Sequence, residues 1–335
     1  MLRFILRRLL LLIPVVIGLT VIMFAIARIL PGDPVALAAG PNATQAEIAA
    51  LATEYGLDKP IWTQYATYLT GLLHGDLGTS LLTRRPVAKD IAAYLPATLE
   101  LVVAAMTIAV VVGIPLGLIT AVWRNRWPDY LAQIGAIGAI SMPRFFLGLL
   151  LQLCFAMWLM WLPLGGRLPI IVIPPRAVTG FLTIDSLIAG NWTAFVTALR
   201  HLALPAIAMS LSPLATIMRM MRSSTIEVMQ QDYVMTARAL GLPPRQIVTK
   251  YVARNAVSAT LTVIGLYFGW LLGGTVLVET VFDWPGLGLY ATKAIVSQDM
   301  MPVIGVALVI CLLFVFTNLV IDVLYGVINS KVRYS

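Results

Sequence analysis

The chain has 335 residues, of which 60% are hydrophobic and 11% are charged, and its mean hydropathy is +0.91. This composition excludes an ordinary soluble domain and is typical of a polytopic membrane protein. The formal net charge of +8 comes from basic residues that gather between apolar runs, which favours membrane topology over nucleic-acid binding as its cause.

Six charge-free runs are long enough to cross a membrane, because a helix needs about 20 residues to span about 30 Å of hydrocarbon. They lie at residues 9–27, 101–122, 145–162, 202–218, 255–278 and 300–321. We therefore predict an all-α polytopic membrane protein with six transmembrane helices.

Basic residues gather on one side of the predicted membrane. With the N-terminus inside, that side holds 13 Lys and Arg residues and three acidic residues. The opposite side is longer and holds nine Lys and Arg residues and eleven acidic residues. Since cytoplasmic loops are enriched in Lys and Arg, we predict that both termini are cytoplasmic and that the protein is a multi-pass protein of the cell (inner) membrane. The first run is longer than the core of a secretory signal, so we expect it to remain as a span.

These spans divide the chain into three parts: a first transmembrane helix at 1–30, an external loop at 31–97 and a five-helix domain at 98–335. In the external loop, the prolines of PGDP at 31–34 end the first helix. Thr44 and Glu47 have the spacing of a capping box, and Pro60 precedes an amphipathic stripe that suits the membrane interface. Residues 163–200 predict a second outer loop with an interfacial segment.

Motifs for catalysis and cofactor binding are missing from the sequence. No G-x-x-x-x-G-K-[ST] phosphate loop occurs, and the two histidines, His74 and His201, are far apart. We therefore expect no catalytic residue, no metal site and no cofactor in this chain. Cys154 and Cys311 lie within predicted spans, so a disulfide is not expected either.

Ionisable residues within the spans are few, which argues against ion-coupled secondary transport. Asp322 lies near the inner end of the sixth span, where pairing with a basic residue is the simpler interpretation. Arg144 follows Ser141 and Pro143 at the start of the third span, and a buried guanidinium must face protein or water rather than lipid. Two interpretations stay open: Arg144 lines the translocation path together with Ser141, or it makes a structural contact.

A polar segment at residues 222–256 interrupts the apolar runs on the inner side. Ser224 and Glu227 have capping-box spacing, so they predict the start of a helix. This helix should end at Leu240, because Gly241 can adopt the left-handed conformation that follows a helix. A helix and turn of this kind carry no catalytic residues. They suit a cytosolic segment that a separate soluble subunit can bind and move.

A second helix is predicted after this turn, since Pro243 and Pro244 fit its first turn. Its apolar face would comprise Ile247, Val248, Tyr251 and Val252. The alternative is an amphipathic hairpin on the membrane surface.

The segment DYVMTARALGL at 232–242 resembles the EAA loop of binding-protein-dependent ABC importer permeases, in the form found in the dipeptide/oligopeptide/nickel branch. Further agreements are PGDP at 31–34, YGLDKPIW at 55–62, HGDLGTS at 74–80, SMPRFFLGLLL at 141–151, ETVFDWPGLG at 279–288 and IDVLYGVIN at 321–329. Residues 178–191 look most like the B-type permeases of dipeptide importers. Arg144 and Leu240 depart from the family pattern, where a small or aromatic residue and a basic residue are expected.

The resemblance implies the type I permease fold of ABC importers. It also implies half of an importer pore that works with a second homologous permease, two cytosolic ATP-binding subunits and an external peptide-binding protein. ATP and Mg would be bound by the partner ATPases, so this chain would be a transport subunit and not an enzyme. The matched segment would form the ATPase-coupling helix, with Asp232, Tyr233, Thr236, Ala237, Arg238, Ala239, Leu240, Gly241 and Leu242.

Dipeptides or short peptides are the cargo that the resemblance implies. Within the family, nickel chelate, glutathione, oligopeptide and haem stay open as alternatives. Outside it, the alternatives are an ion-coupled secondary transporter and a passive channel or scaffold.

The stretch from Glu279 to Gly288 cannot continue the fifth span as a lipid-facing helix, because Pro285 and the glycines leave backbone groups unsatisfied. We expect it to fold against the outer mouth of the pore, with Phe282 and Trp284 packed and Asp283 near water. These three residues would form an external gate that meets the loaded binding protein. A plain interfacial loop anchored by Trp284 is the alternative.

Overall fold

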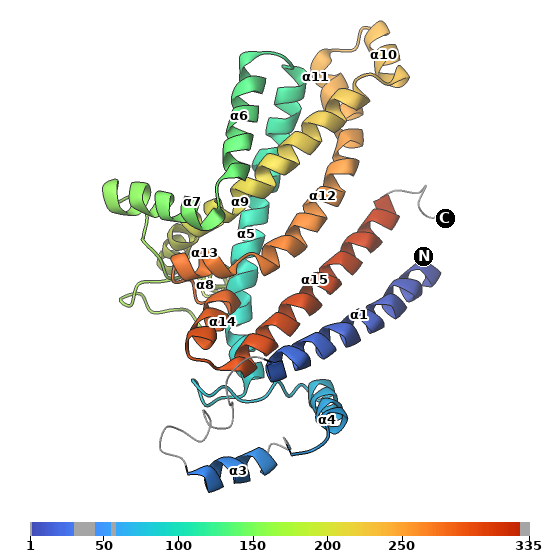
Figure 1. Cartoon of the computed structure of the whole chain (residues 1–335). Helices are drawn as coiled ribbons and strands as arrows, with labels where there is room; N and C mark the ends of the chain where they lie inside the picture. Colours follow the sequence, from blue (N-terminus) through green and yellow to red (C-terminus); the bar gives the residue numbers. More distant parts are fainter. Residues whose placement is uncertain (1, 30–43, 55–57, 329–335) are drawn as a thin grey trace.

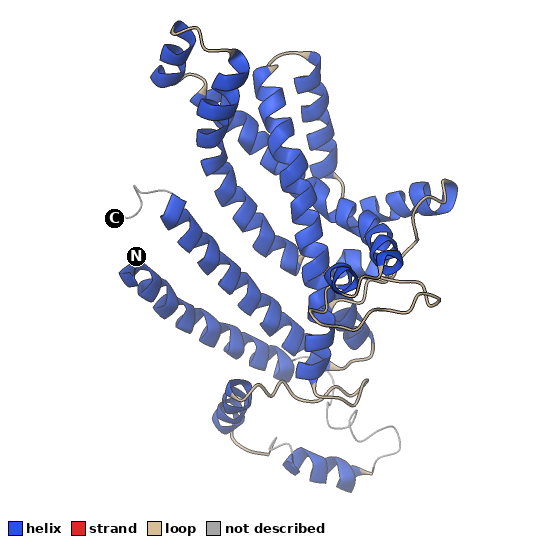
Figure 2. Ribbon diagram, turned by 180° about the vertical axis from the view of Figure 1, so that it is seen from behind, coloured by secondary structure: helices blue, strands red, loops and turns tan. Residues whose placement is uncertain are grey.

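The computed structural model describes residues 2–29, 44–54 and 58–328 (Figure 1). The predicted helix end at 31–34 lies outside these residues, and so does the side chain of Asp322. The described chain is helical and contains no β-strand (Figure 2), which confirms the all-α prediction for this part of the sequence.

Long apolar helices form the body of the protein. They are Leu2–Ile29 (α1), Val87–Val122 (α5), Trp192–Val228 (α9), Ala253–Gly273 (α12) and Met300–Ile328 (α15). Four stretches are long and apolar enough to cross a membrane, namely α5, α9, the continuous Pro244–Gly273 and Met300–Ile321, and a bent pair adds a fifth. The predicted runs at 101–122, 202–218 and 300–321 lie within these helices, whereas the run at 255–278 extends past the end of α12 at Gly273.

The predicted third span at 145–162 is wrong in its bounds. The structure has Trp127–Ser141 (α6), followed by Arg144–Leu151 (α7) and a π-helix at Gln152–Trp158 (η1), and the two parts are bent by 107°. Pro143 breaks the helix between them, since the residue before a proline avoids the helical region and Met142 is extended with ψ 131°. The polar and glycine residues of α6 made this helix look less apolar than the run that follows it.

The core lies where α5, α9 and α12 pack together. Its buried side chains include Leu101, Met209, Ile217 and Leu271, and the outer residues Phe282 and Trp284 belong to the same cluster. Burial of this apolar surface stabilises the bundle. Many apolar side chains of α1 and α6 are exposed instead, as expected for helices that face lipid or another subunit.

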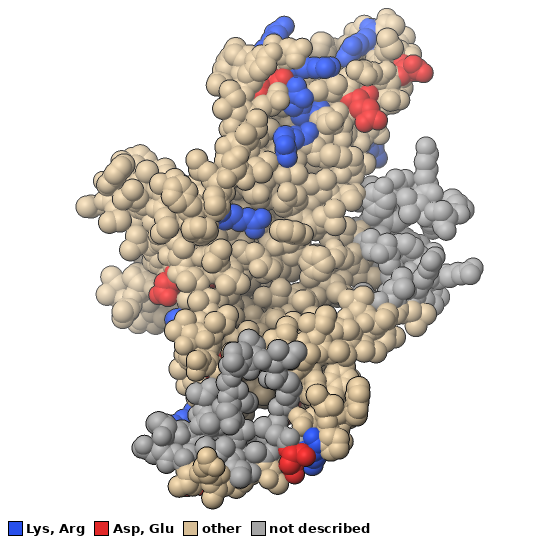
Figure 3. All heavy atoms as spheres, in the orientation of Figure 1, with Lys and Arg blue, Asp and Glu red and all other residues tan. Residues whose placement is uncertain are grey.

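Short helices lie at the two ends of the molecule. One end carries Asp232–Ala239 (α10) and Pro244–Gln246 (α11), which leads into a π-helix at Ile247–Val252 (η2). The opposite end carries Gln45–Glu54 (α3) and Ile61–Leu73 (α4), and α1 begins and α15 ends away from it (Figure 1). Lys and Arg atoms gather over the end with α10, and the middle of this face is mostly uncharged (Figure 3).

Two predicted helix starts in the loop at 31–97 are confirmed. At α3, the Glu47 carboxylate accepts the backbone N–H of Thr44 at 2.7 Å, and the Thr44 hydroxyl accepts the N–H of Glu47 at 3.4 Å, which is the reciprocal pattern of a capping box. Pro60 directly precedes α4. The α4 helix packs on α1, where the hydroxyls of Thr20 and Tyr65 lie 2.9 Å apart.

Candidate functional site

The segment that resembles a coupling loop forms a short helix outside the long-helix body. The α10 helix ends at Ala239, one residue before the predicted end, and Leu240 is its C-cap. Gly241 has φ +74°, as predicted from the glycine. The N–H of Gly241 donates to the carbonyl of Arg238 at 2.9 Å, and that of Leu242 donates to Ala237 at 3.2 Å. This pair of bonds is a Schellman motif, so a glycine is required at this bend.

The start of this helix was predicted incorrectly. Ser224 and Glu227 do not cap a new helix, because α9 continues through them to Val228. The α10 helix instead begins at Asp232 after an extended Gln231, and no side chain caps it. The apolar packing of α9 overrides the local capping signal, since Ser224 is itself largely buried.

A small hydrophobic cluster joins α10 to the next helix. Val234 and Ala237 on α10 are buried against Ile247 and Val252 on η2. In addition, the side-chain amide of Asn255 donates to the hydroxyl of Tyr233 at 3.0 Å. Since α11, η2 and α12 form one continuous stretch that is long and apolar enough to cross a membrane, α10 packs directly on the start of a candidate span. Of the predicted apolar face of this helix, Ile247 and Val252 are buried whereas Tyr251 is exposed.

Three apolar side chains of this segment are exposed. Tyr233, Met235 and Leu240 are 42%, 60% and 75% exposed, and they are spread along the helix among exposed polar residues. Among the predicted coupling residues, Ala237 is buried and Leu242 is partly buried. The exposed ones are Asp232, Tyr233, Thr236, Arg238, Ala239, Leu240 and Gly241.

The stretch after α12 turns back on the bundle, as expected. It forms a hairpin of two short helices, Val276–Val281 (α13) and Leu287–Val296 (α14). Phe282 and Trp284 are each 1% exposed, whereas Asp283 is exposed and has φ +45°. The packing predicted for these three residues is therefore confirmed; their role as a gate is not tested by it.

A buried carboxylate holds this hairpin closed. Glu279 on α13 is fully buried and accepts hydrogen bonds from the hydroxyl of Thr98 at 2.7 Å and from the N–H groups of Gly288 and Leu289 at 2.6 and 3.1 Å. Two of these donors belong to the first turn of α14, where a negative charge is favourable. Thr98 also accepts the N–H of Leu287 at 2.8 Å, so α5, α13 and α14 meet at one hydroxyl.

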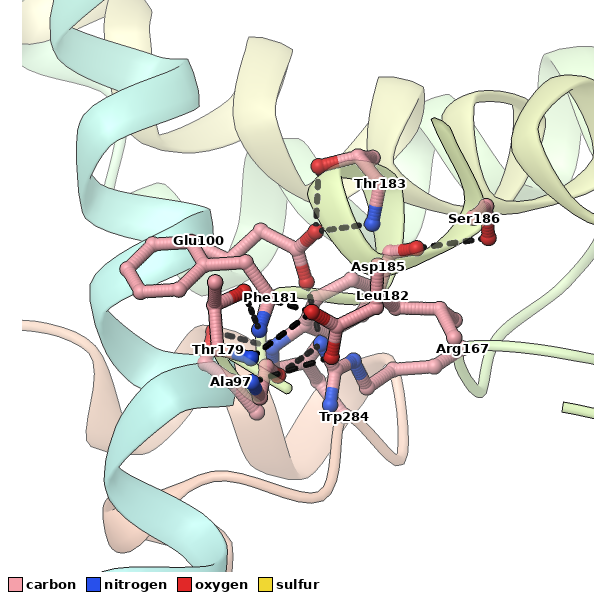
Figure 4. A network of polar contacts seen from close by, with 11 residues as sticks. Ala97, Glu100, Arg167, Thr179, Phe181, Leu182, Thr183, Asp185, Ser186 and Trp284 are labelled. Atoms are coloured by element: carbon pink, nitrogen blue, oxygen red, sulfur yellow. Dashed lines mark hydrogen bonds and ion pairs between the residues drawn. The ribbon is translucent and has the colours of Figure 1, made fainter. Parts of the chain in front are cut away.

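A second polar network ties the loop at 159–181 to the hairpin (Figure 4). The guanidinium of Arg167 forms an ion pair with Glu100 on α5 and lies over the Trp284 ring, 5.5 Å from its centroid. Glu100 also accepts from the N–H of Thr183 at 2.8 Å, at the start of Leu182–Ile188 (α8). The Trp284 indole N–H donates to the carbonyl of Ala97.

The last residues of this loop are folded around Asp185 of α8 (Figure 4). Burial alone would raise the pKa of Asp185, but hydrogen bonds from Thr179 and Gly180 outweigh burial and lower this pKa below its ordinary value. Sequence reasoning missed Thr98, Glu100 and Arg167. The available signal was the pair of polar residues in LPATLEL at 95–101, directly before a long apolar run.

Arg144 lies at the bend between α6 and α7 and lines a cavity of about 570 Å³. The other lining residues are apolar or small, and include Trp270, Leu277 and Phe314. Gly274 permits the close approach, because a Cβ there would lie 2.6 Å from the Nη1 atom of Arg144. Within the described part of the chain, the Arg144 side chain has no hydrogen bond or ion pair. Ser141 does not line this cavity, and its hydroxyl donates to the carbonyl of Ile137.

Known proteins resemble this chain along its whole length. Residues 113–334 match the family described as "Binding-protein-dependent transport system inner membrane component", and residues 1–102 match the N-terminal region of such membrane components. The probable D,D-dipeptide transport system permease protein DdpB of Escherichia coli (strain K12) is 45% identical, over 96% of this chain and 94% of the relative.

Two further relatives give the same result. The dipeptide transport system permease protein DppB of Escherichia coli (strain K12) is 43% identical over 100% of this chain and 99% of its own. The glutathione transport system permease protein GsiC of Salmonella paratyphi A (strain ATCC 9150 / SARB42) is 39% identical over 100% of both chains. All three are transport permeases and not enzymes. This chain, a multi-pass inner-membrane protein, therefore belongs to the family of binding-protein-dependent transport system inner membrane components.

Proposed function

We propose that this chain is a permease subunit of an ATP-driven importer of dipeptides or short peptides. The observation that carries the cargo class is full-length similarity, at 43% and 45% identity, to two permeases named for dipeptides. Membership of a binding-protein-dependent family disfavours the ion-coupled transporter and the passive channel. Glutathione is a second candidate cargo, because the GsiC relative is 39% identical over the whole chain.

In the proposed topology, six helices cross the membrane and both termini are cytoplasmic. The 28-residue α1 and the bent pair of α6 and α7 would add two spans to the four long apolar ones. The gathering of basic residues over the end with α10 supports a cytoplasmic position for that end (Figure 3). The alternation then places α4, the hairpin of α13 and α14, and the loop at 159–181 outside.

The proposed partners are a second homologous permease, two cytosolic ATP-binding subunits that hold ATP and Mg, and an external peptide-binding protein. The exposure of Tyr233, Met235 and Leu240 around α10 supports insertion of this short helix into a cleft of a soluble subunit, where all three side chains would be covered. The coupling residues at 232–242 would make this contact.

The proposed mechanism follows one continuous stretch of chain. When the ATP-binding subunits close, they push α10, and the cluster of Val234, Ala237, Ile247 and Val252 transmits the displacement to α12. The outer end of α12 leads into the α13–α14 hairpin after Gly274. The same helix therefore connects the coupling contact with the external gate at Phe282, Asp283 and Trp284. Since coupling is reciprocal, loading from outside must also change ATP hydrolysis.

Arg144 is proposed to line the translocation path. Its guanidinium has an apolar cavity of about 570 Å³ in front of it, and an unpaired cation at this depth is stable only beside water or a polar ligand. A passing peptide carboxylate would satisfy it.

Reconstitution tests the proposed function. The chain is placed in proteoliposomes with its partner permease, ATP-binding subunits and binding protein, and uptake of alanyl-alanine, tetra-alanine and glutathione is measured with and without ATP. We expect ATP-dependent uptake of alanyl-alanine above the other two. Preferential uptake of glutathione would transfer the assignment to that cargo, and uptake independent of ATP would contradict the importer.

A further inference from the structure

A small polar cavity lies beside the external hairpin, apart from the Arg144 cavity. Its volume is about 260 Å³, and its lining includes Arg167, Asp283, Lys293, Tyr94 and Tyr290. These residues come from the loop at 159–181, from the turn between α13 and α14, from α14 itself and from α5. We propose that this cavity is a transient binding site for a zwitterionic dipeptide, an inference that rests on the proposed function.

The cavity contains an acidic and a basic side chain that do not form an ion pair with each other. Within the described residues, neither Asp283 nor Lys293 has an ion pair or a side-chain hydrogen bond. Asp283 has φ +45°, a conformation that is uncommon outside glycine. The buried neighbours Phe282 and Trp284 fix the backbone on either side of Asp283, so the position of this exposed residue at the cavity is well defined. An acid and a base held apart suit a ligand with an ammonium at one end and a carboxylate at the other.

Arg167 adds a donor to the basic side of the cavity. Its Nη2 atom is bound by Glu100 and donates to the carbonyl of Gly180 at 3.2 Å, which neutralises and orients the guanidinium. Its Nε atom, by contrast, is buried and has no hydrogen-bond partner within the described chain. A buried N–H without a partner is costly, so an oxygen that accepted from it would be favoured. Lys293, which is exposed in the lining, is the cation that suits a carboxylate in the cavity.

The wall of the cavity is aromatic and rigid. The rings of Tyr94 and Tyr290 stack with centroids 4.9 Å apart and an interplanar angle of 17°. The hydroxyl of Tyr290 is anchored on Asp90 at 3.0 Å. Such a wall accepts small apolar side chains without selecting one, as a general dipeptide site requires.

The size of the cavity limits the ligand. An extended dipeptide is about 7 Å long, and 260 Å³ lies just below the usual range for small-molecule pockets, which begins at about 300 Å³. A tetrapeptide of about 14 Å would place its two charged ends beyond one such cavity. A charged side chain of the binding protein, inserted here instead, would pair with only one of Asp283 and Lys293 and leave the other unpaired. The two-ended dipeptide therefore fits this set of groups better than either.

The test uses the complete complex in nanodiscs without the binding protein, so that capture by the latter does not mask the site. Binding is measured by saturation-transfer difference NMR for alanyl-alanine, N-acetyl-alanyl-alanine and alanyl-alanine amide. We expect the zwitterion to bind about fivefold more tightly than either blocked peptide, the value of an ion pair at a partly exposed site.

Two variants assign the charges. Lys293→Gln should abolish the preference over the amide and keep the preference over the acetylated peptide, and Asp283→Asn should do the reverse. Asparagine tolerates the left-handed backbone, so the second variant keeps the turn. Lys89→Gln removes an exposed cation outside the cavity and is the matched control, with no expected change.

Equal binding of all three peptides to the wild-type complex, or no binding, would overturn the inference. It would also fall if both variants weakened association with the loaded binding protein and left the peptide preferences intact. Because the readout is binding and not uptake, either result leaves ATP-driven dipeptide uptake, and with it the proposed function, standing.

Discussion

Trp284 donates its indole N–H to the backbone carbonyl of Ala97 at 2.9 Å, and both residues are buried. Trp284 lies in the turn of the external hairpin and Ala97 lies in α5, which packs on α9 through the core. This bond therefore fixes the position of the hairpin on the body of the bundle. If the hairpin moves as an external gate, either this bond breaks or α5 moves together with the hairpin.

Loss of this bond should loosen the hairpin. Trp284→Phe keeps an aromatic ring but removes the donor, and we expect the complex in detergent to lose about 1 kcal/mol of stability, together with any further cost of the smaller ring. The measurement is thermal unfolding, with Trp62→Phe as control because Trp62 is 81% exposed. Equal melting temperatures for the two variants would show that the bond does not hold the hairpin.

The hydroxyl of Thr98 should be worth more than its size suggests. Thr98→Val is nearly isosteric, yet it removes the donor to Glu279 and the acceptor of the Leu287 N–H. Two buried groups then lose a partner, so we expect a loss of about 3 kcal/mol and faster proteolysis between α13 and α14. Thr98→Ser retains the hydroxyl and should stay close to wild type. A Thr98→Val protein as stable as Thr98→Ser would contradict this account.

An ion pair near the inner ends of α6 and α9 should be required for folding. Asp129 is 1% exposed and accepts from Nε and Nη2 of Arg222 at 2.7 and 2.8 Å. Asp129→Asn removes the charge and leaves the guanidinium of Arg222, which is 21% exposed, without its counter-charge, so we expect a loss of about 2 kcal/mol, less than for a fully buried pair. We expect a lower yield of folded protein in the membrane, measured by size-exclusion profile after solubilisation. Unchanged yield and melting temperature would reduce the pair to a dispensable contact.

Accessibility decides between the two interpretations of Arg144. If Arg144 lines the translocation path, Arg144→Cys should react with a water-soluble thiol reagent in at least one nucleotide state. The background for this reaction is a protein in which Cys154 and Cys311 are replaced by serine. Arg144→Met should then reduce uptake, since the cation at the cavity is lost. Full protection in both nucleotide states together with normal uptake by Arg144→Met would make this residue structural.

Local signals were sufficient where one short segment decides the structure. The spacing of Thr44 and Glu47 predicted a capping box, and Gly241 predicted a left-handed bend, because each depends on neighbours within a few residues. Ser224 and Glu227 gave an equally strong local signal that failed, since burial of α9 continues through them. Pro143 is a local signal for a bend, but the hydropathy of α6 is only moderate, so the helix before the bend was not predicted as part of a span.

Long-range pairs could not be predicted from one sequence. Arg167 and Glu100 are separated by 67 residues, and neither has a periodic or motif context that identifies its partner. The pairing arises because the loop at 159–181 folds back on α5. The charged cavity beside the hairpin depends on the same fold-back, so none of its basic residues was singled out beforehand.

The coupling segment provides the most direct test of the central claim, that motion of α10 drives import. Gly241→Val strains the backbone because its φ is +74°, although no neighbouring atom lies within 4 Å of an added Cβ. Gly75→Val is the matched control, with φ +77°, the same open surroundings and a position in the external loop.

Both variants are reconstituted with all partners, and ATP-dependent uptake of alanyl-alanine is measured beside the ATPase rate that the loaded binding protein stimulates. We expect Gly241→Val to lose at least about tenfold of both rates while the permease stays inserted and assembled with the second permease, whereas Gly75→Val should keep both. Wild-type uptake and stimulated ATPase rates in Gly241→Val would contradict the claim that residues 232–242 couple ATP hydrolysis to transport.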